Sequence, residues 1–115
     1  MRYLLFLTLF FLPMSAHAQS QTEMNQQTYL DYHKADDELN RVYKALLPRL
    51  DPKSKEMLIT AQLAWIKFRD ADAEARAAIN IGGTIHPMIL NLTMTASTQA
   101  RTKELKEWMK ELDSH

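Results

Sequence analysis

The sequence predicts an all-α protein, a small antiparallel arrangement of three helices that follows a cleaved signal peptide. Three observations lead to this fold class. Apolar residues recur at steps of three and four along most of the chain, which is the spacing of one helical face. No stretch of useful length alternates apolar and polar residues as a strand would. Helix breakers, Pro48 and the pair Gly82-Gly83, divide the chain into three such segments.

The N-terminal residues are typical of an export signal. Arg2 precedes an almost purely apolar run over residues 3–12, and Ala16-His17-Ala18 is an A-x-A-type cleavage site. A membrane anchor is the competing interpretation, but a bilayer-spanning helix needs about 20 apolar residues and this run is much shorter. We therefore expect a signal peptide over residues 1–18 and a periplasmic or secreted domain over residues 19–115.

The composition of the mature segment excludes several classes of function. Its net charge is −1, because the chain is neutral overall and Arg2 leaves with the signal, so bulk charge does not attract nucleic acid. The chain has no cysteine, which rules out disulfides, a thiolate nucleophile and cysteine-ligated metal. It also leaves no lipid-acceptor cysteine after the signal. We expect no membrane attachment after cleavage and a core that holds the fold alone.

The first predicted helix begins near Ser20 and ends near Leu47. Ser20 and Glu23 have the S/T-x-x-E order of a capping box, which satisfies backbone donors at a helix start. Pro48 should end or kink the helix, because proline lacks the N–H that an interior turn requires. The apolar stripe of this helix comprises Leu39, Val42, Tyr43, Leu46 and Leu50.

The second predicted helix begins with Asp51 as N-cap and Pro52 at the first helical position, and it should end at Gly82-Gly83. The third begins near Pro87 after a short connection. The face expected to be buried in the second helix comprises Leu58, Ala61, Trp65, Phe68 and Ala75, widened by Ala64, Ala71 and Ala78. The corresponding face of the third comprises Met88, Leu92, Leu105, Trp108 and Leu112.

The sequence offers no convincing catalytic or metal site. Potential ligands gather on one segment, at Asp31, His33, Asp36, Asp37 and Glu38. Only His33 and Asp37 form a histidine-carboxylate pair one turn apart, and no H-E-x-x-H pattern exists, so a solvated acidic face is the favoured interpretation. No serine lies in a glycine-flanked elbow. We predict no catalytic residue, no metal and no cofactor.

Two polar groups could instead stabilise the packing. Trp65 and Arg69 are one helical turn apart, so the guanidinium can lie over the indole, while Asp70 could pair with a base on another helix. Packing is favoured over ligand binding, since aromatic residues at helical spacing usually belong to a core. One face of the first helix carries Asp36, Asn40 and Tyr43, for which a satisfied polar cluster between helices is favoured over a ligand site.

The loop over residues 80–87 is the strongest candidate for partner binding. Its glycines, Gly82 and Gly83, permit backbone conformations that expose N–H and C=O groups to a partner. A helix C-cap followed by a turn, with Ile81 and Ile85 packing inward, is the alternative interpretation, and the two can coexist.

Motifs spread through the mature segment resemble one family, the LprI-like lysozyme inhibitors. They comprise Gln21-Thr22-Glu23-Met24-Asn25, Ala35-Asp36, Leu39-Asn40, Tyr43, Ala61-Gln62, Ala64-Trp65, Phe68-Arg69-Asp70, Gly82-Gly83-Thr84-Ile85, Pro87-Met88, Thr98, Arg101-Thr102 and Glu104-Leu105. The resemblance implies a small helical domain outside the cytoplasm. For the family's namesakes it also implies inhibition of C-type lysozyme.

The sequence departs from the family pattern in two respects. Members usually carry cysteines that can pair, and Gln27, Ala73 and Thr93 stand where three of them are expected here. Loss of such bridges typically costs about 2–5 kcal/mol in a small secreted domain. Leu63 replaces a residue that is commonly basic in relatives. Both changes bear on the rigidity and the binding surface of the domain.

The resemblance and the export signal together predict an inhibitor that binds a lysozyme and blocks its cleft. We expect the loop residues Gly82, Gly83, Thr84 and His86 to make the contact, with Thr84 and His86 as polar tips. A non-inhibitory envelope module that binds other chains is the alternative, with an adaptable surface from Met24, Met57, Met88, Met94 and Met109. An enzyme acting on the cell wall is disfavoured by the missing site geometry.

Overall fold

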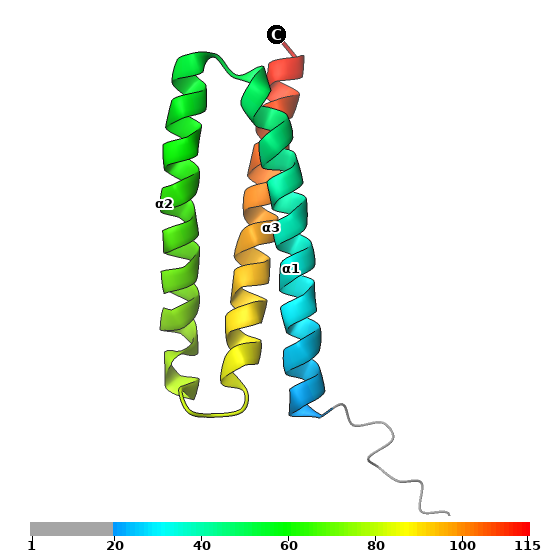
Figure 1. Cartoon of the computed structure of the whole chain (residues 1–115), viewed down its shortest axis with the longest axis vertical. Helices are drawn as coiled ribbons and strands as arrows, with labels where there is room; N and C mark the ends of the chain where they lie inside the picture. Colours follow the sequence, from blue (N-terminus) through cyan, green and yellow to red (C-terminus); the bar gives the residue numbers. More distant parts are fainter. Residues whose placement is uncertain (1–19) are drawn as a thin grey trace, which may run out of the picture.

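The computed structural model describes residues 20–115, so the predicted signal peptide and Gln19 lie outside the described residues. Three long helices make up the fold (Figure 1), namely α1 (Gln21–Leu46), α2 (Pro52–Ala77) and α3 (His86–Asp113). Short 3₁₀ segments, η2 (Leu47–Arg49) and η3 (Ala78–Asn80), follow the first two. Within residues 20–115 there is no strand, and the prediction of an all-α antiparallel arrangement is confirmed.

The helix ends follow the capping chemistry of the sequence. The Ser20 hydroxyl accepts a hydrogen bond from the Glu23 backbone N–H at 3.1 Å, and the Asp51 carboxylate accepts one from the Ser54 N–H at 2.8 Å. Pro48 lies in η2, directly after α1, as predicted. α2 ends at Ala77, earlier than the expected glycine pair, because η3 tightens its last turn.

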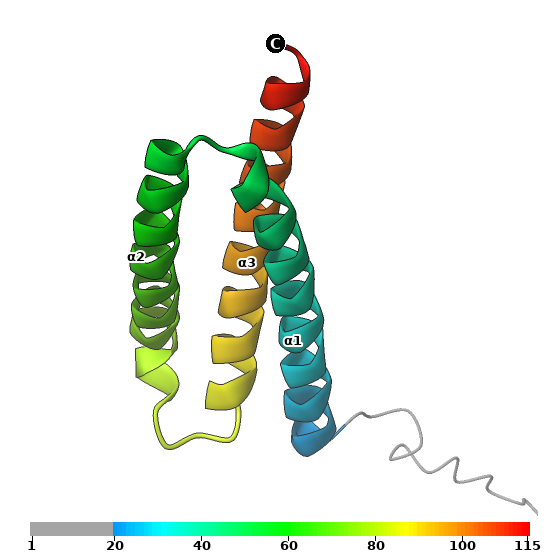
Figure 2. The same ribbon diagram turned by 45° about the horizontal axis from the view of Figure 1, so that its top comes forward.

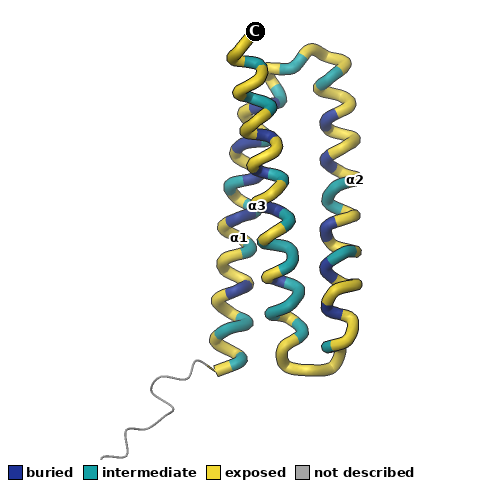
Figure 3. The backbone as a smooth tube through the Cα atoms, turned by 180° about the vertical axis from the view of Figure 1, so that it is seen from behind, coloured by how far each residue is buried: buried dark blue, intermediate teal, exposed yellow. Residues whose placement is uncertain are grey.

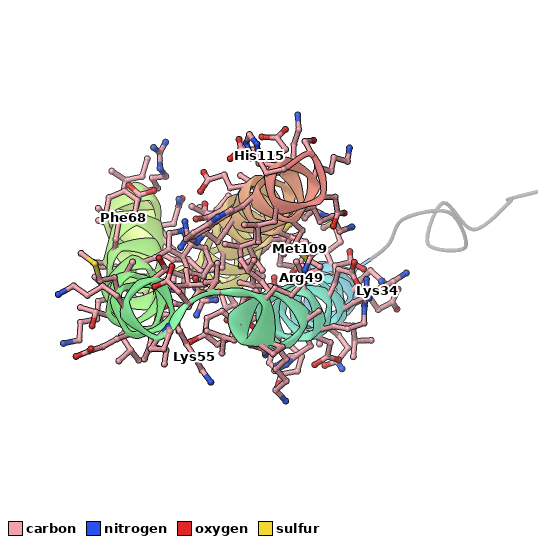
Figure 4. The ribbon with its side chains drawn as sticks, turned by 90° about the horizontal axis from the view of Figure 1, so that it is seen from above. Lys34, Arg49, Lys55, Phe68, Met109 and His115 are labelled. Carbon is pink, nitrogen blue, oxygen red and sulfur yellow. The ribbon has the colours of Figure 1, made fainter. Side chains whose placement is uncertain are left out.

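In space the order of the helices is α1, α3, α2, with α3 between the other two (Figures 1 and 2). The first two helices of the chain, α1 and α2, therefore lie on opposite sides of α3. The molecule is an open layer of helices, and the far side of α2 has no neighbouring helix (Figure 4). None of the helices in the described part of the chain has the length and apolar character needed to cross a membrane.

The apolar core lies toward the end of the molecule that carries η2 (Figure 3). Its buried members are Leu39, Val42, Leu46, Leu58 and Leu105. Toward the other end the buried side chains become small or polar, with Ala73 and Ala77 on α2 and Thr98 on α3. Small side chains allow α2 and α3 to approach closely there, so the contact depends on shape and hydrogen bonding more than on apolar volume.

The buried face predicted for α2 is wrong in part. Phe68 is 63% exposed and points away from α3 (Figure 4), and the alanines grouped with it are exposed. The buried residues of α2 are Leu58, Gln62, Arg69, Ala73 and Ala77. α2 carries two apolar stripes, and the one that faces α3 includes polar residues whose hydrogen bonds are satisfied there. Leu92 of α3, also expected in the core, is exposed as well.

Candidate functional site

The connection between α2 and α3 forms a turn at the end of the molecule where α1 begins (Figure 1). Gly82 has a φ of +83°, a conformation that strains any residue with a side chain. The Gly83 N–H donates to the Asn80 carbonyl at 2.9 Å, and a Cβ at Gly83 would lie 3.2 Å from that same oxygen. The backbone conformation therefore requires glycine at position 82, and at Gly83 a side chain would crowd the Asn80 carbonyl.

A polar network from α1 anchors this turn. The Asn25 side-chain amide donates to the Thr84 carbonyl oxygen at 2.9 Å, and Gln21 donates to the Asn25 side-chain oxygen at 2.8 Å. Asn91 of α3 donates to the Thr28 hydroxyl at 3.3 Å and to the Asn25 carbonyl at 3.4 Å. The loop is thus connected directly to α1, and the same segment of α1 is connected to α3.

The exposed surface of the loop consists of apolar side chains and of backbone groups. Ile81 is 72% exposed and Ile85 is 37% exposed, so these two isoleucines do not pack inward as the alternative interpretation of the loop required. Thr84 is exposed, whereas His86 begins α3 and is half-buried. The His86 Nε2 is shielded from solvent and has no partner within residues 20–115. Thr84 is therefore the polar side chain that this loop presents.

Arg69 of α2 is the centre of a second group of functional candidates, which reaches across to α1. Its guanidinium lies 5.2 Å from the Trp65 ring centroid and 5.3 Å from that of Tyr32. It pairs with Asp70 at 2.9 Å and with Asp36 of α1 at 3.4 Å. The predicted cation-π contact with Trp65 is confirmed. Asp70 pairs within its own helix and not across helices, because Arg69 itself reaches α1 through Asp36.

This Arg69 cluster has the character of a structural contact. The Arg69 side chain is 7% exposed, and burial raises the pKa of the Tyr32 hydroxyl above its usual value while the guanidinium opposes that shift. Two donors of this buried guanidinium are held by carboxylates and two rings lie close to it, which leaves little of the group accessible to a ligand. It bridges α1 and α2 across the open layer of helices, and we assign it that role.

The other predicted motif residues occupy separate places. Arg101 of α3 donates to the Gln62 side-chain oxygen of α2 at 3.0 Å and pairs with Glu104 at 3.0 Å. Asn40 is exposed and donates to Asp36 at 3.4 Å. Tyr43 packs against the apolar core. The expected common cluster of Asp36, Asn40 and Tyr43 is therefore limited to its first two members.

The acidic face of α1 borders an open groove of about 590 Å³ between α1 and α3. Glu38 there contacts Arg41 at 2.7 Å and Lys106 of α3 at 3.1 Å. Hydrogen bonds from Arg41 and then Lys106 lower the Glu38 pKa to about 2. Over residues 20–115, no three histidine or carboxylate side chains are grouped closely enough to hold a metal ion.

Sequence reasoning missed the residues that anchor the loop, namely Asn25, Thr28 and Asn91 as a connected set. Thr28 is buried and lies one heptad before the buried Ala35, so its position on the inward face of α1 is visible in the spacing. Tyr32, which covers Arg69, was also missed. It lies one turn before Asp36, and that spacing is the only local signal for it.

Comparison with known proteins gives one family and one relative. The family model described as lysozyme inhibitor LprI matches residues 14–105. An uncharacterized protein, R02472, of Rhizobium meliloti (strain 1021) is 32% identical, in a match that covers 84% of this chain and 79% of the relative. No solved structure matches this chain.

Proposed function

Since the chain belongs to the LprI lysozyme inhibitor family, we propose that it binds a C-type lysozyme outside the cytoplasm and blocks the sugar-binding cleft of that enzyme. The family match over residues 14–105 carries this proposal. The family is one of inhibitors and not of catalysts, and the partner it implies is a protein. The export signal predicted over residues 1–18 supports a periplasmic or secreted location.

The loop from Gly82 to His86 is the proposed contact surface. A glycosidase cleft of this kind contains two carboxyl groups, which accept hydrogen bonds when ionised. The backbone N–H groups of Gly82, Thr84 and Ile85 make no hydrogen bond within the described residues. Together with the Thr84 hydroxyl they are donors available to such carboxylates, and the exposed Ile81 adds apolar contact area.

The hydrogen bonds that anchor the loop support its role as an inhibitory contact, because they order the loop before it binds. Asn25 fixes the Thr84 carbonyl, and the Gly83 N–H and His86 N–H both bond within the turn. A loop that is ordered before binding loses less conformational entropy on association, which increases affinity. Electrostatic steering contributes little, because the mature chain has a net charge of −1. Binding should therefore depend weakly on salt.

The test is inhibition of lysozyme by the purified chain 19–115, followed as lysis of a cell-wall suspension. We expect slowed lysis, together with direct binding of the chain to lysozyme that an excess of a chito-oligosaccharide occupying the same cleft displaces. Thr84→Ala should weaken inhibition, whereas the matched control Thr60→Ala, an exposed threonine on α2, should not.

Two outcomes would count against the proposal. Unchanged lysis at a large molar excess, with several lysozymes, would remove the inhibitory function. Inhibition that Thr84→Ala and Thr60→Ala leave equally strong would place the contact away from the loop. The envelope-module alternative predicts instead that the protein suppresses aggregation of unrelated unfolded chains without affecting lysozyme.

A further inference from the structure

α2 presents an apolar stripe to solvent in addition to the one that it buries against α3. Phe68 is 63% exposed and Met57 62% exposed, and Figure 4 shows Phe68 on the outer side of α2. Exposed alanines continue the stripe at alternating steps of four and three, which is the spacing of a heptad seam. This heptad stripe comprises Met57, Ala61, Ala64, Phe68, Ala71 and Ala75 of α2, with Ala78 at the start of η3.

The heptad stripe apart from Met57 is symmetric about a point midway between Phe68 and Ala71. When a second copy of α2 runs antiparallel about that point, Phe68 of one copy faces Ala71 of the other. Ala64 then faces Ala75, and Ala61 faces Ala78. Each large ring meets a small residue, and the alanines allow the two helices to approach closely. The same patch serves both copies, as a twofold interface requires.

Charges beside the heptad stripe select the antiparallel direction. Lys67 and Glu74 lie one heptad apart on the same flank, both are exposed, and neither forms an ion pair within residues 20–115. In an antiparallel pair Lys67 of each copy lies beside Glu74 of the other, which gives two attractive contacts. In a parallel pair Lys67 would instead lie beside Asp72 of the other copy and Glu74 beside Ile79, so only one of the two charges would find a partner, against both in the antiparallel pair.

We propose that the mature protein forms a homodimer through the heptad stripe of α2, with the two copies of the helix antiparallel. This interaction goes beyond the proposed lysozyme inhibition and does not depend on it. The loops at Gly82 would lie at opposite ends of the dimer, about 38 Å apart along the helix axis at 1.5 Å per residue. Both loops remain free in this arrangement.

The test is the mass of the chain 19–115 measured by sedimentation over a range of protein concentrations at low ionic strength. The mass should rise from that of a monomer to twice that value. Phe68→Glu should leave a monomer at every concentration, because it places a charge in the seam. Leu63→Glu is the matched control, since Leu63 is 59% exposed on another side of α2, and it should still dimerise.

Exchanging the charges of Lys67 and Glu74 tests the direction of pairing without changing the heptad stripe. Lys67→Glu and Glu74→Lys should each weaken dimerisation by about tenfold, because each turns two attractive pairs into repulsive ones. The double variant should dimerise like the original chain. Circular dichroism should show equal helix content for all variants.

Three results would overturn the dimer. The first is a wild-type chain that stays monomeric at every concentration, as it would if a different protein covered the stripe. The second is a dimer that persists in Phe68→Glu. The third is a double charge exchange that fails to restore the affinity lost in the single variants.

Discussion

The side-chain amide of Asn25 donates a hydrogen bond of 2.9 Å to the carbonyl oxygen of Thr84, which lies 59 residues further along the chain. This contact fixes the middle of the α2-α3 loop to the first helix. It links the packing of α1 to the shape of the surface proposed to bind lysozyme.

Asn25→Ala should weaken lysozyme inhibition without unfolding the protein. A single hydrogen bond contributes about 1 kcal/mol, so the inhibition constant should rise about fivefold if loop order supports binding. Inhibition constants and helix content of the variant are the measurements. Gln26→Ala, an exposed neighbour, is the control and should bind normally. Equal constants for both variants would show that the anchor does not matter to binding.

The Arg69 cluster should stabilise the contact between α1 and α2. In a double-mutant cycle, Arg69→Ala and Asp36→Ala should show a coupling of about 0.5–3 kcal/mol in the free energy of urea unfolding. Arg69→Lys should recover little of the loss, because an ammonium cannot occupy both rings and both carboxylates. Additive effects of the two alanine substitutions would argue against a direct interaction.

Substitutions of a buried and of an exposed apolar residue should differ strongly in their effect on stability. Leu39→Ala should cost about 2–5 kcal/mol of unfolding free energy, because Leu39 is buried among the three helices. Phe68→Ala should change it by less than about 0.5 kcal/mol at dilute protein concentration, since the ring is exposed. A large loss for Phe68→Ala in the monomer would mean that α2 packs through the other face.

The Glu38 contacts should make stability depend on acid pH. Hydrogen bonds from Arg41 and Lys106 lower the Glu38 pKa from 4.5 to about 2 in the folded protein. A lowered folded pKa means that the contribution is complete above about pH 4.5 and is lost as the pH falls toward 2. The difference in urea midpoint between the original chain and Glu38→Gln should therefore shrink over that interval. Glu111→Gln is the control, and a difference for Glu38→Gln that stays constant with pH would contradict the assignment.

Local chemistry in the sequence was sufficient to predict the helices and part of the candidate site. Ser20 and Asp51 cap helices because their side chains reach backbone donors three residues away, and Trp65 meets Arg69 one turn away. Contacts between distant residues were not predictable in the same way. Arg69 and Asp36 are 33 residues apart, and nothing in the local spacing indicates that these two side chains meet.

The prediction of the buried face of α2 was wrong for a different physical reason. Both stripes of α2 have helical periodicity, so hydrophobicity alone favours the one with Phe68 and the alanines. The fold buries the stripe with Gln62 and Arg69, whose polar groups find partners on α3 and α1. Helical spacing identifies which residues share a face, and hydrogen-bonding partners elsewhere in the chain decide which face is buried.

The position of α3 between α1 and α2 makes the core depend on the helix that is synthesised last. α1 is synthesised first, but its main packing partner is α3, which is synthesised last. A chain that contains only α1 and α2 therefore lacks the face of α3 against which both helices pack. The incomplete chain can form isolated helices but cannot bury Leu39 and Leu46 against Leu105. The apolar core of this domain therefore cannot be completed until the C-terminal helix has been synthesised.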